Sequence, residues 1–178
     1  MATDAFLLFT KPTTPGNLQA VGETSDPAFK GAIELIDFSF GAENATSIGS
    51  ATSGAGTGKA RLNEFVIRKT TDKASGVLFQ ACCTGAHFPE AVLSIRKTIG
   101  TGKPSVYLVY RFSMVFCSKV EWSGPGDEGP IESVTFAYGA LQVSYQSIDA
   151  ATGALVGTPV LISWNQVVNT PQFPVAGA

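Results

Sequence analysis

The sequence predicts a mainly β fold, a small barrel of antiparallel strands with one short flanking α-helix. Apolar and polar residues alternate over residues 106–122 and again over residues 132–147, which is the period of two expected of strands that bury one face. A single segment, residues 74–84, has helical periodicity instead. A length of 178 residues suits one domain, so we expect a single domain over residues 1–178.

The two longest strands are predicted at residues 106–122, with the apolar side chains at even positions, and at residues 132–147. Between them, residues 123–130 read Ser-Gly-Pro-Gly-Asp-Glu-Gly-Pro, which favours a turn. The apolar phase of the second strand changes near Gly139 and Ala140, which predicts a β-bulge or bend of the kind that curls a barrel. Shorter strands are expected at residues 5–9, 32–40, 60–70, 91–96 and 160–164.

The predicted helix begins behind Asp72, a favourable N-cap, and ends at Gly85, a favourable residue just past a helix end. Its apolar residues follow the spacing i, i+3, i+4, i+7, i+8. These residues are Ala74, Val77, Leu78, Ala81 and Cys82.

Residues 41–58 form a connection rich in Gly, Ala, Ser and Thr with very few large apolar side chains. A segment of this composition is expected not to fold on itself and to be mobile or held by a partner. The tail from about residue 169 is Pro-rich.

The composition argues against nucleic-acid and membrane partners and favours self-association. Twelve basic and 14 acidic residues give a net charge of −2, which offers no electrostatic basis for nucleic-acid binding. No apolar run approaches the ~18 residues of a membrane span, so no membrane insertion is expected. Charged residues make up only 15% of the chain and mean hydropathy is +0.19, against a typical charged share of ~25%. A surface this poor in charge predicts a homo-oligomer.

Charge is also uneven along the chain. Every Lys and Arg lies at or before Lys119, and the residues after it carry only acids. Those acids are Glu121, Asp127, Glu128, Glu132 and Asp149. The asymmetry is compatible with head-to-tail association of polarised protomers, and equally with scattered, solvated charges.

Candidate catalytic and metal-binding groups are few. His87 follows Cys82 and Cys83 closely enough for a Cys–His nucleophile pair, and Cys117 would complete a zinc set. Adjacent helical cysteines point about 100° apart, however, so the thiols are better interpreted as small buried hydrophobes. We expect no catalytic residues, no metal and no cofactor. Three cysteines, two of them adjacent, also form no disulfide framework.

The stretch Gly54-Ala-Gly-Thr-Gly-Lys59 invites comparison with a phosphate-binding loop, but the pattern fails at two positions. Ser53 stands where the first Gly is needed, and Ala60 follows Lys59 in place of Ser or Thr. The N-terminal segment has no basic region followed by an apolar region of adequate length, so no cleaved signal peptide is expected.

A set of short motifs, in order and at matching separations from about residue 5 to residue 165, resembles the haemolysin-coregulated protein (Hcp) family, the tube proteins of type VI secretion systems. These motifs are Gly22-Glu23-Thr24, Ile33-Glu34-Leu35-Ile36-Asp37-Phe38-Ser39-Phe40-Gly41, Gly58-Lys59, Thr71-Asp72-Lys73-Ala74-Ser75, Leu78-Phe79-Gln80-Ala81-Cys82-Cys83-Thr84-Gly85, His87-Phe88-Pro89-Glu90-Ala91, Ile95-Arg96-Lys97, Glu132-Ser133-Val134 and Trp164-Asn165.

The resemblance implies a structural protein with no enzymatic activity. It implies hexameric rings that stack into an inner tube and carry effectors in the lumen, with sheath, spike and baseplate proteins as further partners. It also implies synthesis in the bacterial cytoplasm and export without a signal peptide, to the medium or a target cell.

Two groups of site residues follow from combining the resemblance with strand alternation. On a strand at residues 32–40, Phe38 and Phe40 share a face with Glu34 and Ile36 and are expected to enter the core. Ile33, Leu35, Asp37 and Ser39 share the other face, so Asp37 and Ser39 become lumen and cargo candidates. The ring-stacking candidates are Asn44, Ser50, Gly54, Gly56, Lys59 and Arg61.

Two other functions fit the sequence. One is the tube protein of a related contractile, phage-tail-like particle. The other is a free-standing β-barrel that binds a ligand, which we would expect to be monomeric.

Overall fold

The computed structural model describes residues 2–47, 56–98, 104–126 and 129–177, and the predicted fold class is confirmed there: antiparallel strands with a single α-helix, α1 (Ala74–Thr84). A short 3-10 turn lies at Pro27–Phe29. The strands are β1 (Ala2–Phe9), β2 (Ile33–Glu34), β3 (Asp37–Ser39), β4 (Ala42–Ser47), β5 (Gly56–Leu62), β6 (Phe65–Thr70), β7 (His87–Thr98), β8 (Ser105–Gly126), β9 (Gly129–Ile148) and β10 (Leu155–Asn165).

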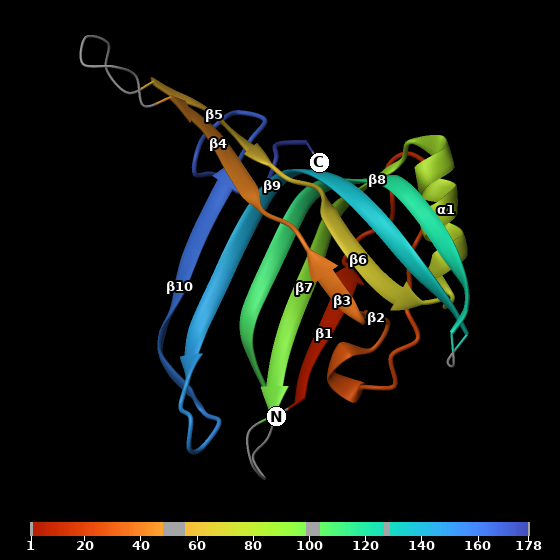
Figure 1. Cartoon of the computed structure of the whole chain (residues 1–178), viewed down its shortest axis with the longest axis horizontal. Coiled ribbons are helices and arrows are strands. Elements are labelled where there is room, and N and C mark those ends of the chain that lie inside the picture. Colours follow the sequence, from red (N-terminus) through yellow and green to blue (C-terminus); the bar gives the residue numbers. More distant parts are fainter. Residues whose placement is uncertain (1, 48–55, 99–103, 127–128, 178) are drawn as a thin grey trace.

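Eight of these strands form one curled antiparallel sheet (Figure 1). Its order is β2-β1-β7-β8-β9-β6-β3, and β10 pairs with β9 beside this path. Strands β4 and β5 form a separate hairpin that projects from the body (Figure 1).

The strand expected at residues 32–40 is instead two short strands at opposite edges of the sheet. β2 pairs with β1, and β3 pairs with β6. Between them the Leu35 N–H donates to Ala5 O of β1 at 3.0 Å, and the Ile36 N–H donates to Arg68 O of β6 at 2.8 Å. This segment therefore joins the two edges and closes the curled sheet into a barrel.

The split corrects the expected faces of this segment. Phe38 and Phe40 pack against the core, as predicted, but Ile33 and Leu35 are buried too and Ile36 is exposed. The inward phase changes as the chain crosses from one edge of the sheet to the other. A single uninterrupted strand could not bury both sets of side chains, because its alternation would place them on opposite faces.

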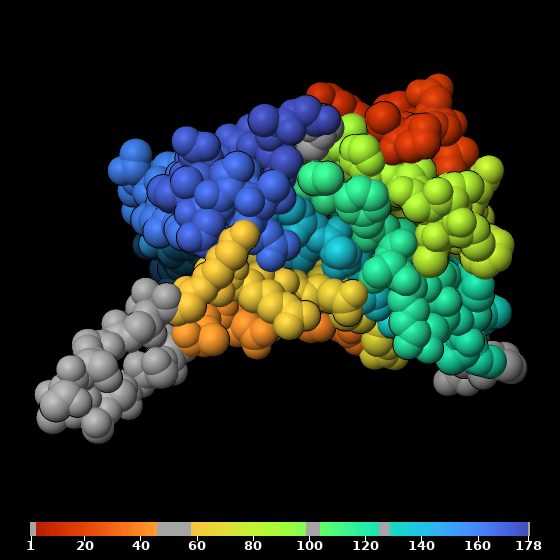
Figure 2. Space-filling view, turned by 90° about the horizontal axis from the view of Figure 1, so that it is seen from above, coloured from red at the N-terminus to blue at the C-terminus, as the bar shows by residue number. Residues whose placement is uncertain are grey.

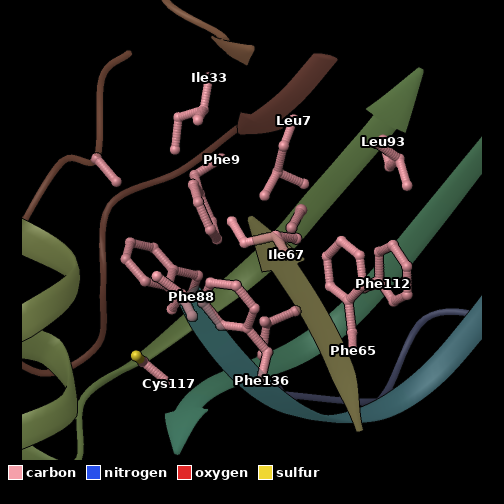
Figure 3. Close-up of a cluster of buried hydrophobic side chains, with 14 of the residues drawn as sticks. Leu7, Phe9, Ile33, Phe65, Ile67, Phe88, Leu93, Phe112, Cys117 and Phe136 are labelled. Atoms are coloured by element: carbon pink, nitrogen blue, oxygen red, sulfur yellow. The ribbon is translucent and has the colours of Figure 1, made fainter. Parts of the chain in front are cut away.

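Phenylalanines fill the barrel interior (Figure 3). Phe65 of β6 stacks on Phe112 of β8 with ring centroids 4.3 Å apart. Phe9, Phe88 and Phe136 are likewise 0–2% exposed. Large aromatic side chains contributed by several strands make this the main apolar contact between the walls of the barrel.

The alternation predicted for residues 106–122 is wrong between Phe112 and Lys119. The inward side chains become Val115 and Cys117, both at odd positions. The phase changes at Met114, which has a left-handed φ of 57°, and a register shift between Cys117 and Lys119 then restores the even phase. The sequence hides both irregularities, because hydrophobic residues occupy each phase.

The β-bulge expected at Gly139 and Ala140 would appear as a shift in the pairing register. No such shift occurs there, because β9 stays in register with β8. The irregular residue is Met114 on the neighbouring strand. Gly139 is needed for a different reason: a Cβ at this position would lie 2.7 Å from Cγ2 of Val175 in the C-terminal tail.

The predicted helix bounds are confirmed, but the residue directly before the helix is Lys73, one position after the expected N-cap Asp72. The Asp72 carboxylate accepts the N–H of Ala74 at 3.0 Å, and Gly85 ends the helix with a left-handed φ of 69°. Ala74, Leu78 and Ala81 form the buried face, and α1 packs against β8.

The connection at residues 41–58 does fold on itself, contrary to expectation. Within this range β4 and β5 pair through Thr46 with Thr57 and Ser47 with Gly56, and the ladder continues to Ala42 with Leu62. Backbone hydrogen bonds hold this ladder, so large apolar side chains are not needed within it. Residues 48–55 lie outside the described part of the chain.

A buried cation connects the helix start to the sheet. Lys69 of β6 is 1% exposed, and its Nζ lies 2.7 Å from Asp72 Oδ1 and 3.6 Å from Oε2 of Glu132, which is fully buried. The same Nζ donates to Ser75 Oγ at 3.0 Å. Trp122 Nε1 donates to Glu132 Oε2 at 3.2 Å. Each partner compensates for part of the solvation that the buried charges lose.

We predict that Lys69→Met lowers the free energy of unfolding by ~3–5 kcal/mol, because it leaves the buried Glu132 carboxylate without its cation. Urea unfolding followed by tryptophan fluorescence measures the change. Lys73→Met, at a lysine whose side chain is 78% exposed, is the control and leaves the midpoint unchanged. Adding Glu132→Gln to Lys69→Met restores part of the loss. Equal midpoints for Lys69→Met and Lys73→Met would show that the buried cluster is not stabilising.

Candidate functional site

β10 is an edge strand with apolar side chains exposed on both of its faces. Within the described chain it pairs with β9 alone. Val160, Leu161 and Ile162 are 58%, 62% and 65% exposed. Because successive side chains of a strand alternate, these three residues uncover both faces at once. An edge with free backbone groups and exposed apolar side chains is a site for association.

The apolar surface extends to residues near Val160–Ile162 in the fold. Tyr145 lies opposite Val160 in the β9–β10 register and is also exposed. Val167 and Val168, just beyond the strand, are more than half exposed. We call Tyr145, Val160, Leu161 and Ile162 the edge patch.

Sequence reasoning placed a strand at residues 160–164 but did not recognise it as an association surface. The signal was present: three consecutive apolar residues within a strand occupy both alternating phases. Such a run indicates a strand that is either buried on both faces or uncovered on both. Only the sheet order shows that β10 is the uncovered kind.

The projecting hairpin holds four of the six ring-stacking candidates. Asn44 lies on β4, and Gly56, Lys59 and Arg61 lie on β5. Ser50 and Gly54 fall outside the described residues. Arg61 Nη1 lies 3.9 Å from Glu43 Oε1 across the hairpin, so part of its charge is already matched within the same protomer.

The two lumen candidates lie on β3 with exposed side chains. Asp37 forms an ion pair with Arg68 of β6. Ser39 lies opposite Val66 in the β3–β6 register. The two therefore share the outward face of this short strand, opposite Phe38.

Of the C-terminal acids, the structure describes Glu121, Glu132 and Asp149, and each has a partner within the protomer. Glu132 is fully buried against Lys69. Glu121 lies 2.8 Å from Lys119, and Asp149 accepts the N–H groups of Ala151 and Thr152 in a turn.

Two of the cysteine and histidine candidates, Cys117 and His87, are engaged in packing contacts. Burial raises the pKa of the Cys117 thiol well above its usual range, and the neighbouring Cys82 raises it further. A raised pKa disfavours the nucleophilic thiolate. The His87 ring packs against Phe116 at 5.1 Å between centroids. In the described part of the chain, no group of three or more His, Cys, Asp or Glu side chains is arranged to hold a metal ion.

The comparison with a phosphate-binding loop fails in the structure as well as in the pattern. Gly56, Gly58 and Lys59 lie within β5, a strand paired with β4. A phosphate-binding loop would curl its backbone N–H groups around an anion and lead into a helix. β5 leads instead into β6.

No helix in the described part of the chain has the length and apolar character needed to cross a membrane.

Comparison with known proteins gives consistent matches. A family model described as "Type VI secretion system effector, Hcp" matches residues 9–145. Protein hcp1 of Pseudomonas aeruginosa is 36% identical over 108 residues, which is 60% of this chain and 65% of that protein. The alignment thus spans a little under two thirds of this relative.

Solved structures match over almost the whole chain. One described as a type six secretion system protein is 29% identical with a TM-score of 0.80, covering 95% of this chain and 99% of the other. Hcp1 from Salmonella typhimurium is similar in fold, with a TM-score of 0.73, 23% identity and coverage of 95% and 98%. With the family model matching most of the chain, the protein belongs to the Hcp family of type VI secretion proteins.

Proposed function

We propose that this chain is the inner-tube component of a type VI secretion system. In this proposal six copies close into a ring, rings stack into a tube, and effectors travel in the lumen. Sheath, spike and baseplate proteins are the further partners, and the tube protein leaves the bacterial cytoplasm by this route. Family membership supports the proposal.

The edge patch is the observation that most directly supports the proposed ring. β10 shows one uncovered backbone edge and apolar side chains on both faces. A surface of this kind, meeting a different surface of the next copy, makes a head-to-tail interface that closes into a ring when the rotation per copy allows it. Burying each exposed apolar side chain contributes on the order of 1–2 kcal/mol.

The packed barrel interior argues against a ligand-binding barrel. Phe9, Phe65, Phe88, Phe112 and Phe136 occupy the space that such a protein would leave for its ligand. A match to a type VI secretion family model also favours a secretion tube over a phage-tail-like particle.

We predict that Leu161→Asp prevents ring formation and yields an 18.6 kDa monomer. Its side chain is already 62% exposed in the protomer, so the charge does not disturb folding but does oppose burial in an interface. Light scattering after size-exclusion chromatography measures the mass, with circular dichroism as the folding check. Leu161→Met, which keeps size and polarity, is the control and retains six times the protomer mass. A Leu161→Asp ring of unchanged mass would exclude β10 as the interface, and a monomeric native chain at micromolar concentration would overturn the ring.

We predict that Ser39→Lys leaves the ring intact and reduces cargo retention, because a long cation replaces a small exposed hydroxyl on the proposed lumen face. The measurement is co-purification of a co-expressed type VI effector with the ring. Ser39→Ala is the control and retains cargo.

Phe40→Ser is the opposite-face comparison. Phe40 contacts Phe65 and Phe112 at centroid distances of 5.6 and 5.3 Å, so its loss destabilises the protomer by ~3–5 kcal/mol. If Phe40→Ser were harmless and Ser39→Lys abolished the ring, the two faces would be the reverse of those proposed.

We predict that replacing residues 44–57 with a short Gly/Ser turn leaves rings intact but prevents them from stacking. The hairpin projects beyond the body of the protomer (Figure 1), where it is placed to reach a neighbouring ring. Negative-stain electron microscopy distinguishes single rings from tubes, and export is measured in a sheath-bearing cell. An equally long Gly/Ser replacement separates the effect of length from that of sequence. Tubes and normal export from the shortened variant would reduce the hairpin to a passive connection.

A further inference from the structure

The projecting hairpin has few attachments to the barrel. In the described chain, β4 and β5 pair with each other and with no strand of the main sheet. At the hairpin base the Asn63 N–H donates to Gly41 O at 2.8 Å, a bond between the two chain segments that enter and leave it. The Leu62 side chain is buried in the core. These contacts hold the base of the hairpin, but they leave its direction to be fixed by something else.

Gln166 supplies a link between the hairpin and the main sheet. Its Oε1 accepts the backbone N–H of Leu62 on β5 at 3.1 Å. Its Nε2 donates to the backbone oxygen of Tyr138 on β9, and its own N–H donates to Gly139 O at 3.0 Å. One amide side chain therefore bridges β5 to β9 from the residue directly after β10. Figure 2 shows β5 in yellow lying against the blue C-terminal segment.

The backbone around Gln166 is held firmly. Asn165 is 3% exposed, and its Oδ1 accepts the N–H groups of Val167 and Val168 at 3.0 and 3.3 Å. The Asn165 N–H also donates to Thr170 O at 2.8 Å. Gln166 thus starts from a fixed point at the end of β10, and an amide is the side-chain group that provides both an acceptor for Leu62 and a donor for Tyr138.

We propose that Gln166 is a positioning residue that fixes the direction of the β4–β5 hairpin and couples it to β10. The hairpin anchor stands on the hydrogen bonds alone. The coupling rests on the proposed function: a neighbouring copy that packs on the edge patch fixes β10, and β10 holds Gln166, which holds the hairpin ready to meet the next ring.

The anchor is tested by amide hydrogen exchange at Leu62. Gln166→Met keeps the length of the side chain and removes both side-chain hydrogen bonds. We expect the Leu62 amide to exchange about tenfold faster than in the native chain, from the loss of its acceptor. Gln146→Met is the matched control, because Gln146 Nε2 bonds Gly157 O at 2.7 Å on β10 and contacts no hairpin residue through that bond. Unchanged Leu62 exchange in Gln166→Met would overturn the anchor.

The coupling is tested on assembled protein by light scattering and electron microscopy. We expect Gln166→Met to retain the native ring mass and to form fewer and shorter tubes, while Gln146→Met matches the native chain in both. Faster Leu62 exchange with unchanged tubes would overturn the coupling and leave the anchor standing. A native chain that forms no rings would refute the proposed function and the coupling together, and the exchange measurement would still decide the anchor.

Discussion

The backbone amides of Leu35 and Ile36 join the two edges of the curled sheet and so close the barrel. The position of the remaining strands depends on this closure. Leu35 donates to β1 and Ile36 donates to β6, so one short segment covers both edges of the curled sheet. The core phenylalanines can then meet from opposite walls. β9 pairs with β8 along one of its edges. Along its other edge, β9 pairs with β6 over residues 131–136 and with β10 over residues 140–148. β10 is therefore the strand left outside the closed path, with one edge that no other strand of the described chain covers and that only the Asn165 bridge to Thr170 engages.

Proteins usually protect such an edge, and β10 does so over only half its length. The register shift between Val156 and Val160 brings Gly157, with a left-handed φ of 71°, and Pro159 into the first half of the strand. A bulge and a proline oppose pairing there. The second half, with the exposed residues Val160 to Ile162, has neither feature. In the proposed ring, this division would direct association to the second half of the edge.

Much of the fold could be predicted from the sequence, and the failures have physical causes. The helix was predictable because its spacing, Asp72 and Gly85 agree. The two long strands were predictable from alternation, but the left-handed Met114 was not, since both phases of β8 are apolar. The split at residues 33–39 depends on barrel closure, a property of the whole sheet. The burial of Glu132 depends on Lys69, which lies far away in sequence. The edge patch could not be predicted for the same reason: it depends on which strands lack a neighbour, and topology decides that.

Assembly of the proposed ring from such an edge would be cooperative. Each protomer offers one edge patch, and the surface that receives it must be a different one, because a patch paired with its own copy would end growth at a dimer. An open chain of copies always leaves one patch exposed to water and pays the entropy of association at every step. Closing the ring buries the last patch without ordering a further protomer. The favourable free energy of apolar burial therefore increases most at the step that closes the ring. Open intermediates are disfavoured relative to separate protomers and complete rings. In the proposed ring this cooperativity would depend on apolar burial and strand geometry, which salt weakens little.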